Sequence, residues 1–389
     1  MGDTVLYLLN VSNPDRLSAD SGWLFADILA PALVDLGTRV TIGCPVPVSD
    51  PRVEHVPMPV VSSKYRVRFT ADVAALAALI EHVEPSVVVA NQVEHAGAIR
   101  AAVLEASSRA RVVGYCHYLP FHVDEQGLQP DAAFVDGGLG LAVRMQFFTG
   151  LAACDRIMVH SPTAATWVAA GMAVLGVDDL AERIRVVPPP RDPRLVADGP
   201  RTPPPLTAGR TVQILYNHRL YEHYGTGRFL ELASQLTANP AVRLTVMDLF
   251  GDRAGGRRSL DASPERHRAA LAEMPGVQVV SDGGDRAFYR ELLAGADLAL
   301  APFRAGCTWS MSLIDCQAMG VPVLAPRLGW LAGAVEEGLA FDEPHEAVKI
   351  AEGLLADPAA WTAASARAAE TTRALAPELV AARYLAAFA

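Results

Sequence analysis

Two serines and an aspartate near residue 315 have the spacing of a helix start that binds an anion. Ser310 and Ser312 stand where a helical pattern begins, and Asp315 follows one turn in. Hydroxyls at such positions cap a helix or reach a phosphate oxygen, and the free N–H groups of the first turn favour an anion. A carboxylate one turn further accepts hydrogen bonds from ribose or sugar hydroxyls. This pattern has the parts of a nucleotide-sugar site.

A strand–loop–helix–strand unit must position these side chains. The apolar runs 298–301 and 321–325 predict two buried strands, and Met311–Met319 predicts the helix between them, closed by Gly320. Ligands of parallel sheets bind outside the carboxyl ends of the strands, where this loop lies. An ordinary crossover with a solvated Asp315 would give the same pattern, so that alternative stays open.

The composition is that of a globular protein with two or three domains. The 389 residues are 51% hydrophobic and 20% charged. No apolar run is long enough to cross a bilayer, and the chain start lacks the basic region of a signal peptide. The five cysteines lack close pairing, which indicates reduced thiols and a cytoplasmic protein. No Cys/His spacing indicates a zinc site.

The net charge of −10, from 33 basic and 43 acidic residues, argues against unaided nucleic-acid binding. One local exception is the loop in which Lys64, Arg66 and Arg68 surround Tyr65. This loop either meets an anionic substrate or membrane surface, or is simply solvated.

The first half alternates between short apolar runs and longer amphipathic segments. The expected strands are residues 5–10, 39–42, 87–90, 112–115, 156–159 and 184–187. The expected helices are residues 23–36, 71–83, 96–107, 141–153 and 162–170. Residues 120–140 are expected to form a long irregular loop, which is commonly functional or mobile.

Polar side chains follow two of these strands. Asn91 and Glu94 come after one strand and His117 directly after the next, so all should face the same side of the sheet. A catalytic group is often mounted at such a strand end, although a lone histidine is more often structural. Ser21 and Gly22 at a helix start give either a second phosphate contact or a plain strand–helix turn.

The alternation restarts after a proline-rich segment, residues 197–210. The expected strands are residues 212–216, 244–247, 277–280 and 339–341, besides the two given above, and helices are expected at 229–236, 287–294 and within 346–389. Two such blocks predict an α/β protein with two doubly wound, Rossmann-like domains facing each other across a cleft. We place the domains at 1–196 and 211–374, with 197–210 as linker and a helix at about 375–389 that packs back on the first domain.

Several segments resemble the family 4 glycosyltransferases, which have the GT-B architecture. The similar segments are Ser21–Trp23, Leu36–Val40, Val186–Pro190, Leu215–Leu220, Ala296–Pro302 and Asp315–Val323. The likeness is strongest over 296–323 and weakest before residue 190. It implies transfer of a sugar from a nucleotide-diphosphate donor with retention at the anomeric carbon, without a required cofactor or metal.

The resemblance also implies a role for individual residues. Diphosphate contacts are implied for Gly22, Arg219, Tyr224, Ser310, Met311 and Ser312. Contacts to the sugar or nucleoside are implied for Asp282, Cys307, Trp309, Leu313 and Asp315. His117 would hydrogen-bond the donor sugar beside the reacting carbon and so counts as catalytic. The leaving phosphate would take the proton of the acceptor, so catalysis is mainly positioning and stabilisation of charge.

Three residues depart from the family pattern. Cys307 and Asp315 replace the usual pair of glutamates, and a thiol cannot accept hydrogen bonds as a carboxylate does. Tyr224 replaces the usual lysine, which weakens neutralisation of the diphosphate unless His223 or Arg304 compensates. The glycine doublet of the first loop is reduced to Gly22.

The acceptor is expected on the first domain. Its candidate contacts are Trp23, Tyr65, Asn91, Glu94, Phe121 and His122. A small soluble specialised metabolite suits this chain better than a lipid or polymer. Two alternatives remain: a GT-B relative with other chemistry, such as a sugar-nucleotide epimerase or a cyclitol-coupling enzyme, and a non-catalytic nucleotide-sugar binding protein. Neither the nucleotide base nor the oligomeric state follows from the sequence, a homodimer being one alternative.

Overall fold

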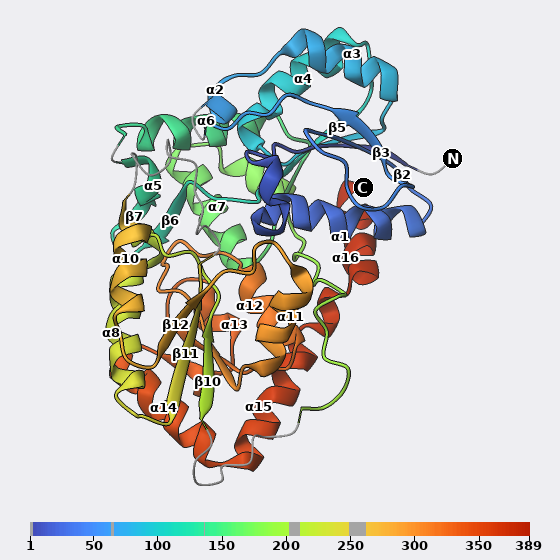
Figure 1. Cartoon of the computed structure of the whole chain (residues 1–389). Coiled ribbons are helices and arrows are strands. Elements are labelled where there is room, and N and C mark those ends of the chain that lie inside the picture. The colour runs from blue at the N-terminus through green and yellow to red at the C-terminus, as the bar shows by residue number, and fades with distance from the viewer. Residues whose placement is uncertain (1–2, 64–65, 136, 202–210, 249–261) are drawn as a thin grey trace. The chain divides into compact units, whose positions relative to one another are not determined.

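The computed structural model describes residues 3–63, 66–135, 137–201, 211–248 and 262–389. By its internal contacts the chain divides into two compact units, residues 1–190 with 375–389, and residues 191–374. Each unit is a parallel α/β sheet with helices on both faces (Figure 1). No helix in the described part of the chain is long and apolar enough to span a membrane.

Unit 1 contains a seven-stranded sheet in the order β3-β2-β1-β4-β5-β8-β9, all parallel. Its strands are β1 (Thr4–Leu8), β2 (Arg39–Cys44), β3 (Glu54–Pro57), β4 (Val87–Ala90), β5 (Arg111–Tyr115), β8 (Arg156–Val159) and β9 (Ile184–Val186). The order reverses between β1 and β4, so this is the switch point at which a ligand is expected.

The helices of unit 1 cover the apolar faces of this sheet. They are α1 (Ser21–Asp35), α2 (Arg66–Phe69), α3 (Val73–Val83), α4 (Ala96–Glu105), α5 (Ala132–Val135), α6 (Gly140–Ala152), α7 (Pro162–Val174) and α16 (Pro377–Phe388). α3 and α4 lie over one face, while α1 and α16 lie together over the other (Figure 1). The last helix of the chain therefore belongs to unit 1, because its buried face, with Tyr384 and Phe388, packs there.

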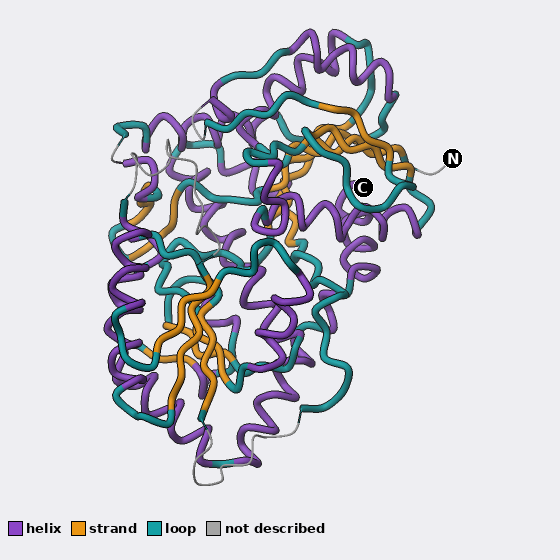
Figure 2. The backbone as a smooth tube through the Cα atoms, in the orientation of Figure 1, coloured by secondary structure: helices purple, strands orange, loops and turns teal. Residues whose placement is uncertain are grey.

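Residues 120–140 are not the irregular loop that the sequence suggests. They form an antiparallel hairpin, β6 (Phe121–Asp124) and β7 (Gly127–Pro130), followed by α5 (Figure 2). Gly127, the first residue of β7, has φ +100°, a backbone conformation that glycine adopts and a residue with a Cβ resists. The prediction was wrong because these strands are short and carry polar residues such as His122 and Asp124.

Unit 2 contains a six-stranded parallel sheet in the order β12-β11-β10-β13-β14-β15. Its strands are β10 (Val212–Tyr216), β11 (Val242–Met247), β12 (Val277–Val280), β13 (Leu298–Leu300), β14 (Val323–Pro326) and β15 (Ala340–Phe341). Here the order reverses between β10 and β13. The buried apolar residues in these strands explain why the sheet is covered on both faces.

The helices of unit 2 form two apolar layers. They are α8 (Thr226–Thr237), α10 (Ser263–Ala272), α11 (Arg286–Gly295), α12 (Met311–Ala318), α13 (Leu331–Ala334), α14 (Pro344–Ala356) and α15 (Pro358–Thr371). Phe229 of α8 and Leu271 of α10 belong to one core cluster, and Leu293 of α11 and Leu313 of α12 to the other. The helical tail expected over 346–389 is three helices, which prolines at 358 and 377 begin anew.

Candidate active site

The switch point of unit 2 brings two loops to the same edge of the sheet. Residues 217–225 follow β10, residues 301–310 follow β13, and these two strands are neighbours. Carboxyl ends of neighbouring parallel strands meet at one edge, so the two loops and the start of α12 surround one place. Arg219 and Tyr224 come from the first loop, and Cys307 to Ser310 from the second.

Asp315 in α12 is a buried carboxylate with one oxygen left over. Its side chain is 3% exposed, which excludes the solvated alternative. Oδ2 accepts a hydrogen bond from the hydroxyl of Tyr289 at 3.2 Å, whereas Oδ1 has no hydrogen-bond partner among the described residues. Burial raises the pKa of Asp315 from 3.8 to about 7, against the opposing charge of Arg286. An unpartnered buried oxygen is costly, so it marks a place for a polar ligand.

Asn217 and Tyr289 hold this carboxylate in place. The Nδ2 group of Asn217, directly after β10, donates to the Tyr289 hydroxyl at 2.8 Å and to the carbonyl of Ser312 at 3.2 Å. Its Oδ1 atom likewise has no hydrogen-bond partner among the described residues. The side chain therefore ties β10 to α11 and α12, and it presents a second unpartnered oxygen at the strand end.

Two arginines and a second buried carboxylate stand behind Asp315. Arg286 at the start of α11 lies 2.6 Å from Asp192 and 4.0 Å from Asp315. Arg194 Nε donates to Asp192 Oδ1 at 2.9 Å. Burial raises the pKa of Asp192, but the hydrogen bond from Arg194 and the charge of Arg286 outweigh it, so its pKa is below the ordinary value. Asp192 thus stays ionised, and Arg286 forms its closer ion pair with Asp192 rather than with Asp315.

The start of α12 is arranged as the sequence suggests. Ser310 is its N-cap, and its hydroxyl accepts from the backbone N–H of Leu313 at 3.2 Å. The side chain of Leu313 is buried in the core, so only its backbone could meet a ligand. Met311 and Ser312 occupy the first turn. Their contacts with phosphate remain predictions.

Cys307 is a buried neutral thiol. Its Sγ donates to the carbonyl of Trp309 at 3.2 Å, and its side chain belongs to an apolar cluster. Burial raises the pKa of this thiol to about 11, against the charge of Arg304. This position therefore presents no negative charge. Asp282, after the edge strand β12, accepts from the N–H of Gly284 at 3.0 Å.

The carboxyl edge of the unit 1 sheet carries a histidine pair. His117 follows β5, and its Nε2 atom lies 3.1 Å from the hydroxyl of Ser21. Nε2 of His160, which follows β8, lies 3.1 Å from the carbonyl oxygen of His117. Burial lowers the pKa of His160 to about 3, so this ring is neutral and can brace the His117 backbone without adding charge.

The start of α1 is already capped by a carboxylate. Asp20 Oδ1 accepts from the backbone N–H groups of Gly22 and Trp23, each at 3.0 Å. A Cβ at Gly22 would lie 3.2 Å from that oxygen, which explains the glycine by its local packing. A diphosphate approaching Gly22 would meet the charge of Asp20, and its contact with Gly22 stays a prediction.

The acceptor candidates divide into buried and accessible side chains. Phe121 is 1% exposed and stacks on Phe148 with ring centroids 5.1 Å apart, and Trp23 is 8% exposed. Both belong to the core, which argues against direct contact with an acceptor. Asn91 accepts from the Tyr7 hydroxyl at 2.8 Å, while His122 is half-buried on β6.

Glu94 and Arg68 form a buried ion pair. Nε of Arg68 lies 3.0 Å from Glu94 Oε1, and their side chains are 11% and 5% exposed. The guanidinium also lies 4.8 Å from the ring centroid of Phe134. Arg68 is therefore not a solvated loop residue. Lys64 and Tyr65, the neighbours that made this loop a candidate, lie outside the described residues.

One family model matches part of the chain. Residues 25–195 match the family described as Glycosyltransferase Family 4. The resemblance to that family is confirmed. None of the curated proteins matches the chain.

Solved structures with a similar fold cover both units. Sucrose-phosphate synthase from Thermosynechococcus elongatus is 15% identical, with a TM-score of 0.72 over 99% of this chain and 98% of that one. Anabaena Alr3699/HepE in complex with UDP-glucose is 14% identical, with a TM-score of 0.69 over 99% of each chain. The E. coli trehalose-6-phosphate protein bound with UDP-2-fluoro glucose is 12% identical, with a TM-score of 0.68 over 99% of this chain and 98% of that one. These likenesses confirm the predicted fold, with two Rossmann-like domains.

The family match falls on the half in which the motifs are weakest. The strongest motifs, over 296–323, lie outside the matched residues, so the family match does not test the roles that the resemblance implies for their side chains. Sequence reasoning missed Asn217, Tyr289, Arg286 and Asp192. Only Asn217 carried a signal, as a polar residue directly after a buried strand.

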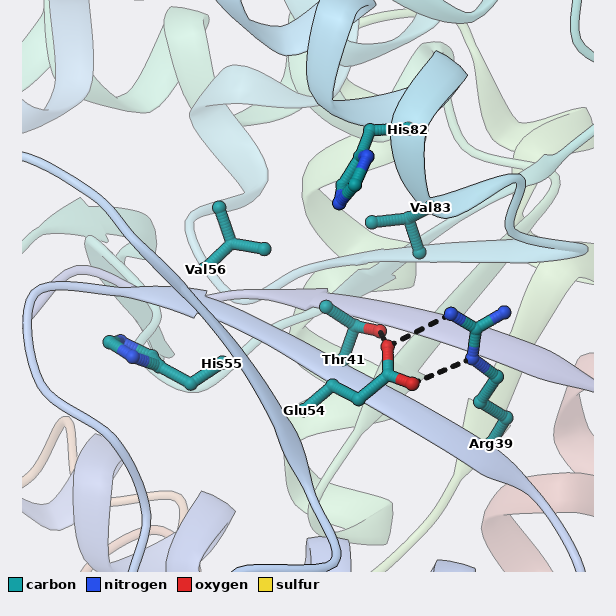
Figure 3. A pocket seen from close by; sticks show the side chains of 7 residues that line it. All are labelled: Arg39, Thr41, Glu54, His55, Val56, His82 and Val83. Atoms are coloured by element: carbon teal, nitrogen blue, oxygen red, sulfur yellow. Dashed lines mark hydrogen bonds and ion pairs between the residues drawn. The ribbon is translucent and has the colours of Figure 1, made fainter.

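A separate pocket of about 340 Å³ lies at the start of β2 and β3 (Figure 3). It is lined by Arg39, Thr41, Glu54, His55, Val56, His82 and Val83. Nε of Arg39 donates to Glu54 at 2.9 Å, and the Thr41 hydroxyl donates to the same carboxylate at 2.9 Å. The carboxylate is thus satisfied, and Arg39 and Glu54 begin their strands, at the edge of the sheet opposite to the switch point. The pocket therefore lies away from the edge of this sheet at which a ligand is expected.

Proposed function

We propose that the chain is a glycosyltransferase that binds a nucleoside-diphosphate sugar on unit 2 and transfers the sugar to a small acceptor with retention of anomeric configuration. The observation that carries the proposal is the buried, unpartnered Oδ1 atom of Asp315 at the switch point of that unit. Such an oxygen accepts ribose hydroxyls, and the helix start beside it favours phosphate. Similar folds in complexes with UDP-glucose support this donor class.

The proposed chemistry needs positioning more than a strong base. The bond between the anomeric carbon and the diphosphate oxygen breaks, and a bond from that carbon to the acceptor oxygen forms on the same face. The acceptor proton passes to the leaving phosphate oxygen. Arg219 and the N–H groups at the start of α12 would stabilise the charge that develops on the diphosphate.

Binding of the donor is tested by thermal unfolding with a panel of nucleoside diphosphates and nucleotide sugars. At a hundred times its dissociation constant a ligand stabilises the folded state by about 2.7 kcal/mol. For a unit of this size this is an increase in Tm of about 5–10 °C. Arg219→Ala should remove most of that increase, because it deletes a phosphate contact. Arg243→Ala, exposed on β11, is the control and should keep it.

The panel also separates the alternatives. If no nucleotide raises Tm, the chain is not a transferase of this donor class. If nucleoside diphosphates bind but no nucleotide sugar is ever consumed with any acceptor, the chain is a binding protein. The cyclitol-coupling alternative rests on Cys307. Its thiol is neutral where the family has a glutamate, so the transferred group would have to bind without a carboxylate at this position.

A second prediction concerns His117, which would contact the donor sugar. His117→Ala should lower kcat by about 100-fold, the typical cost of losing one polar contact to the transition state. The Kd of the nucleoside diphosphate should change less than about twofold, because that part of the donor is proposed to lie on unit 2. His82→Ala, exposed at the end of α3, should leave both constants unchanged. An equal loss of affinity and turnover would contradict the assignment.

A further inference from the structure

Two neighbouring side chains of unit 2 each leave one buried polar atom without a partner. Among the described residues, neither Nε of Arg286 nor Oδ1 of Asp315 has a hydrogen-bond partner. The two side chains lie side by side, with Arg286 Nη2 4.0 Å from Asp315 Oδ2. The side chain of Arg286 is only 18% exposed, so little water reaches it and a missing partner is costly.

The surrounding residues hold both side chains in place. Nη2 of Arg286 pairs with Asp192 Oδ2 at 2.6 Å, and the guanidinium Cζ atom lies 4.9 Å from the ring centroid of Tyr289. The Tyr289 hydroxyl donates to Asp315 Oδ2 at 3.2 Å and accepts from Asn217 Nδ2 at 2.8 Å. These contacts fix the arginine and the aspartate, but they use neither Nε of the one nor Oδ1 of the other.

The two unused atoms are of opposite kinds. Nε of an arginine can only donate a hydrogen bond, and an oxygen of an ionised carboxylate can only accept one. A phosphate oxygen would suit only the arginine, and an ammonium group would suit only the aspartate. A hydroxyl group accepts through its oxygen while it donates its proton, so a single hydroxyl satisfies both atoms. The pair therefore fits a ligand that carries hydroxyl groups.

We infer that Arg286 is a specificity-determining residue that, together with Asp315, binds one hydroxyl of the ribose in the nucleotide sugar. Nε of Arg286 donates to the hydroxyl oxygen, and the hydroxyl donates to Oδ1 of Asp315. The site thereby selects ribose over a deoxyribose that lacks this hydroxyl. The inference rests on the proposed function and deepens it, because the resemblance gives Arg286 no role.

Calorimetry at pH 8, above the pKa of about 7 of Asp315, measures this selectivity. The probes are UDP, ADP and GDP, each with its 2′-deoxy and 3′-deoxy analogues, and dTDP. The measured quantity is the ratio of the dissociation constant of an analogue to that of its ribonucleotide. For the ribonucleotide that the wild type binds best, the ratio should reach about 100 for at least one analogue, since its missing hydroxyl leaves two hydrogen bonds unmade.

Arg286→Lys is the variant that isolates Nε. Lysine keeps a positive charge for Asp192 but has no donor at the position of Nε. The ratio should fall by about tenfold, while the affinity for the deoxy analogue itself should change less than about threefold. Arg286→Met removes every donor and should lower the ratio at least as much, and urea unfolding shows whether both variants are folded.

Arg290→Lys is the matched control. Arg290 lies one turn further along α11 and pairs with Asp198 at 2.9 Å, so the same substitution again removes an Nε donor beside a carboxylate. This variant should keep the wild-type ratio, because Arg290 is not proposed to contact the nucleotide.

The outcomes separate this inference from the proposed function. Wild type that binds no nucleoside diphosphate overturns both. Wild type that binds dTDP more tightly than any ribonucleotide, or that binds both analogues as tightly as the ribonucleotide, overturns the inference alone. An unchanged ratio in a folded Arg286→Lys variant also overturns it, because a buried water rather than the ligand would then satisfy the two atoms.

Discussion

An Asp315→Asn variant is expected to be more stable than the wild type at pH 8 and nearly equal to it near pH 4. Burial raises the pKa of Asp315 in the folded chain from 3.8 to about 7, so the folded chain keeps a proton that the unfolded chain has lost. The stability from the neutral carboxyl group is complete below about pH 4 and is lost as the pH rises to about 7. Asparagine is neutral throughout, so the gain at pH 8 is on the order of a few kcal/mol.

Urea unfolding at pH 4 and pH 8 measures this difference. Glu352→Gln removes an exposed carboxylate from α14 of the same unit and is the matched control, expected to show no such pH-dependent gain. A variant that is less stable than the wild type at pH 8 would show that the ion pair with Arg286 outweighs burial.

The same substitution should weaken donor binding. The carboxylate presents two acceptor oxygens, and the amide presents one, which Tyr289 already occupies. We expect a loss of about 10- to 100-fold in affinity for UDP-glucose at pH 8. The wild-type affinity should rise as the pH is raised through 7, since only the ionised form accepts from both ribose hydroxyls, whereas the affinity of the variant should stay flat. A pH-independent wild type would contradict this role.

Gly225→Ala is expected to cause the largest loss of stability at the switch point. The new Cβ would lie 2.4 Å from the Phe303 carbonyl oxygen, so backbone must move, and φ +68° disfavours any residue with a side chain. The two effects together should cost about 3 kcal/mol or more. Nucleoside diphosphate affinity should fall as well, because the loops after β10 and β13 are no longer held together.

Gly283→Ala separates the two causes. Gly283 has φ +59° with no atom within 4 Å of the added Cβ, so it should cost only about 1–2 kcal/mol. Urea unfolding of both variants makes the comparison. Equal losses in the two would mean that the loops do not touch at Gly225 as described.

Apolar periodicity was enough to predict the strands that lie inside each sheet. Residues 212–216 and 277–280 are predicted to the residue as β10 and β12, because each is a short apolar run bounded by turn residues. β3 (Glu54–Pro57) was missed because it is short, begins with two polar residues and stands at the edge of the sheet. A short edge strand has no apolar periodicity in its sequence, and only its pairing with the neighbouring strand defines it.

The candidate site was predictable only where local patterns carry it. The helix start at Ser310 and the carboxylate one turn later follow from spacing, and the structure places both at the switch point. The contact between Arg286 and Asp192 joins residues that are far apart in the sequence, so no local sequence pattern predicts it. Tyr289 looks like an ordinary core position of α11, and only the fold shows that its hydroxyl holds Asp315.

A crystal structure of the chain with bound UDP tests the central claim most directly. We predict ribose hydroxyls within hydrogen-bond distance of Asp315 Oδ1, and phosphate oxygens at Arg219 and the start of α12. A nucleotide bound elsewhere, with that carboxylate oxygen still unpartnered, would contradict the account.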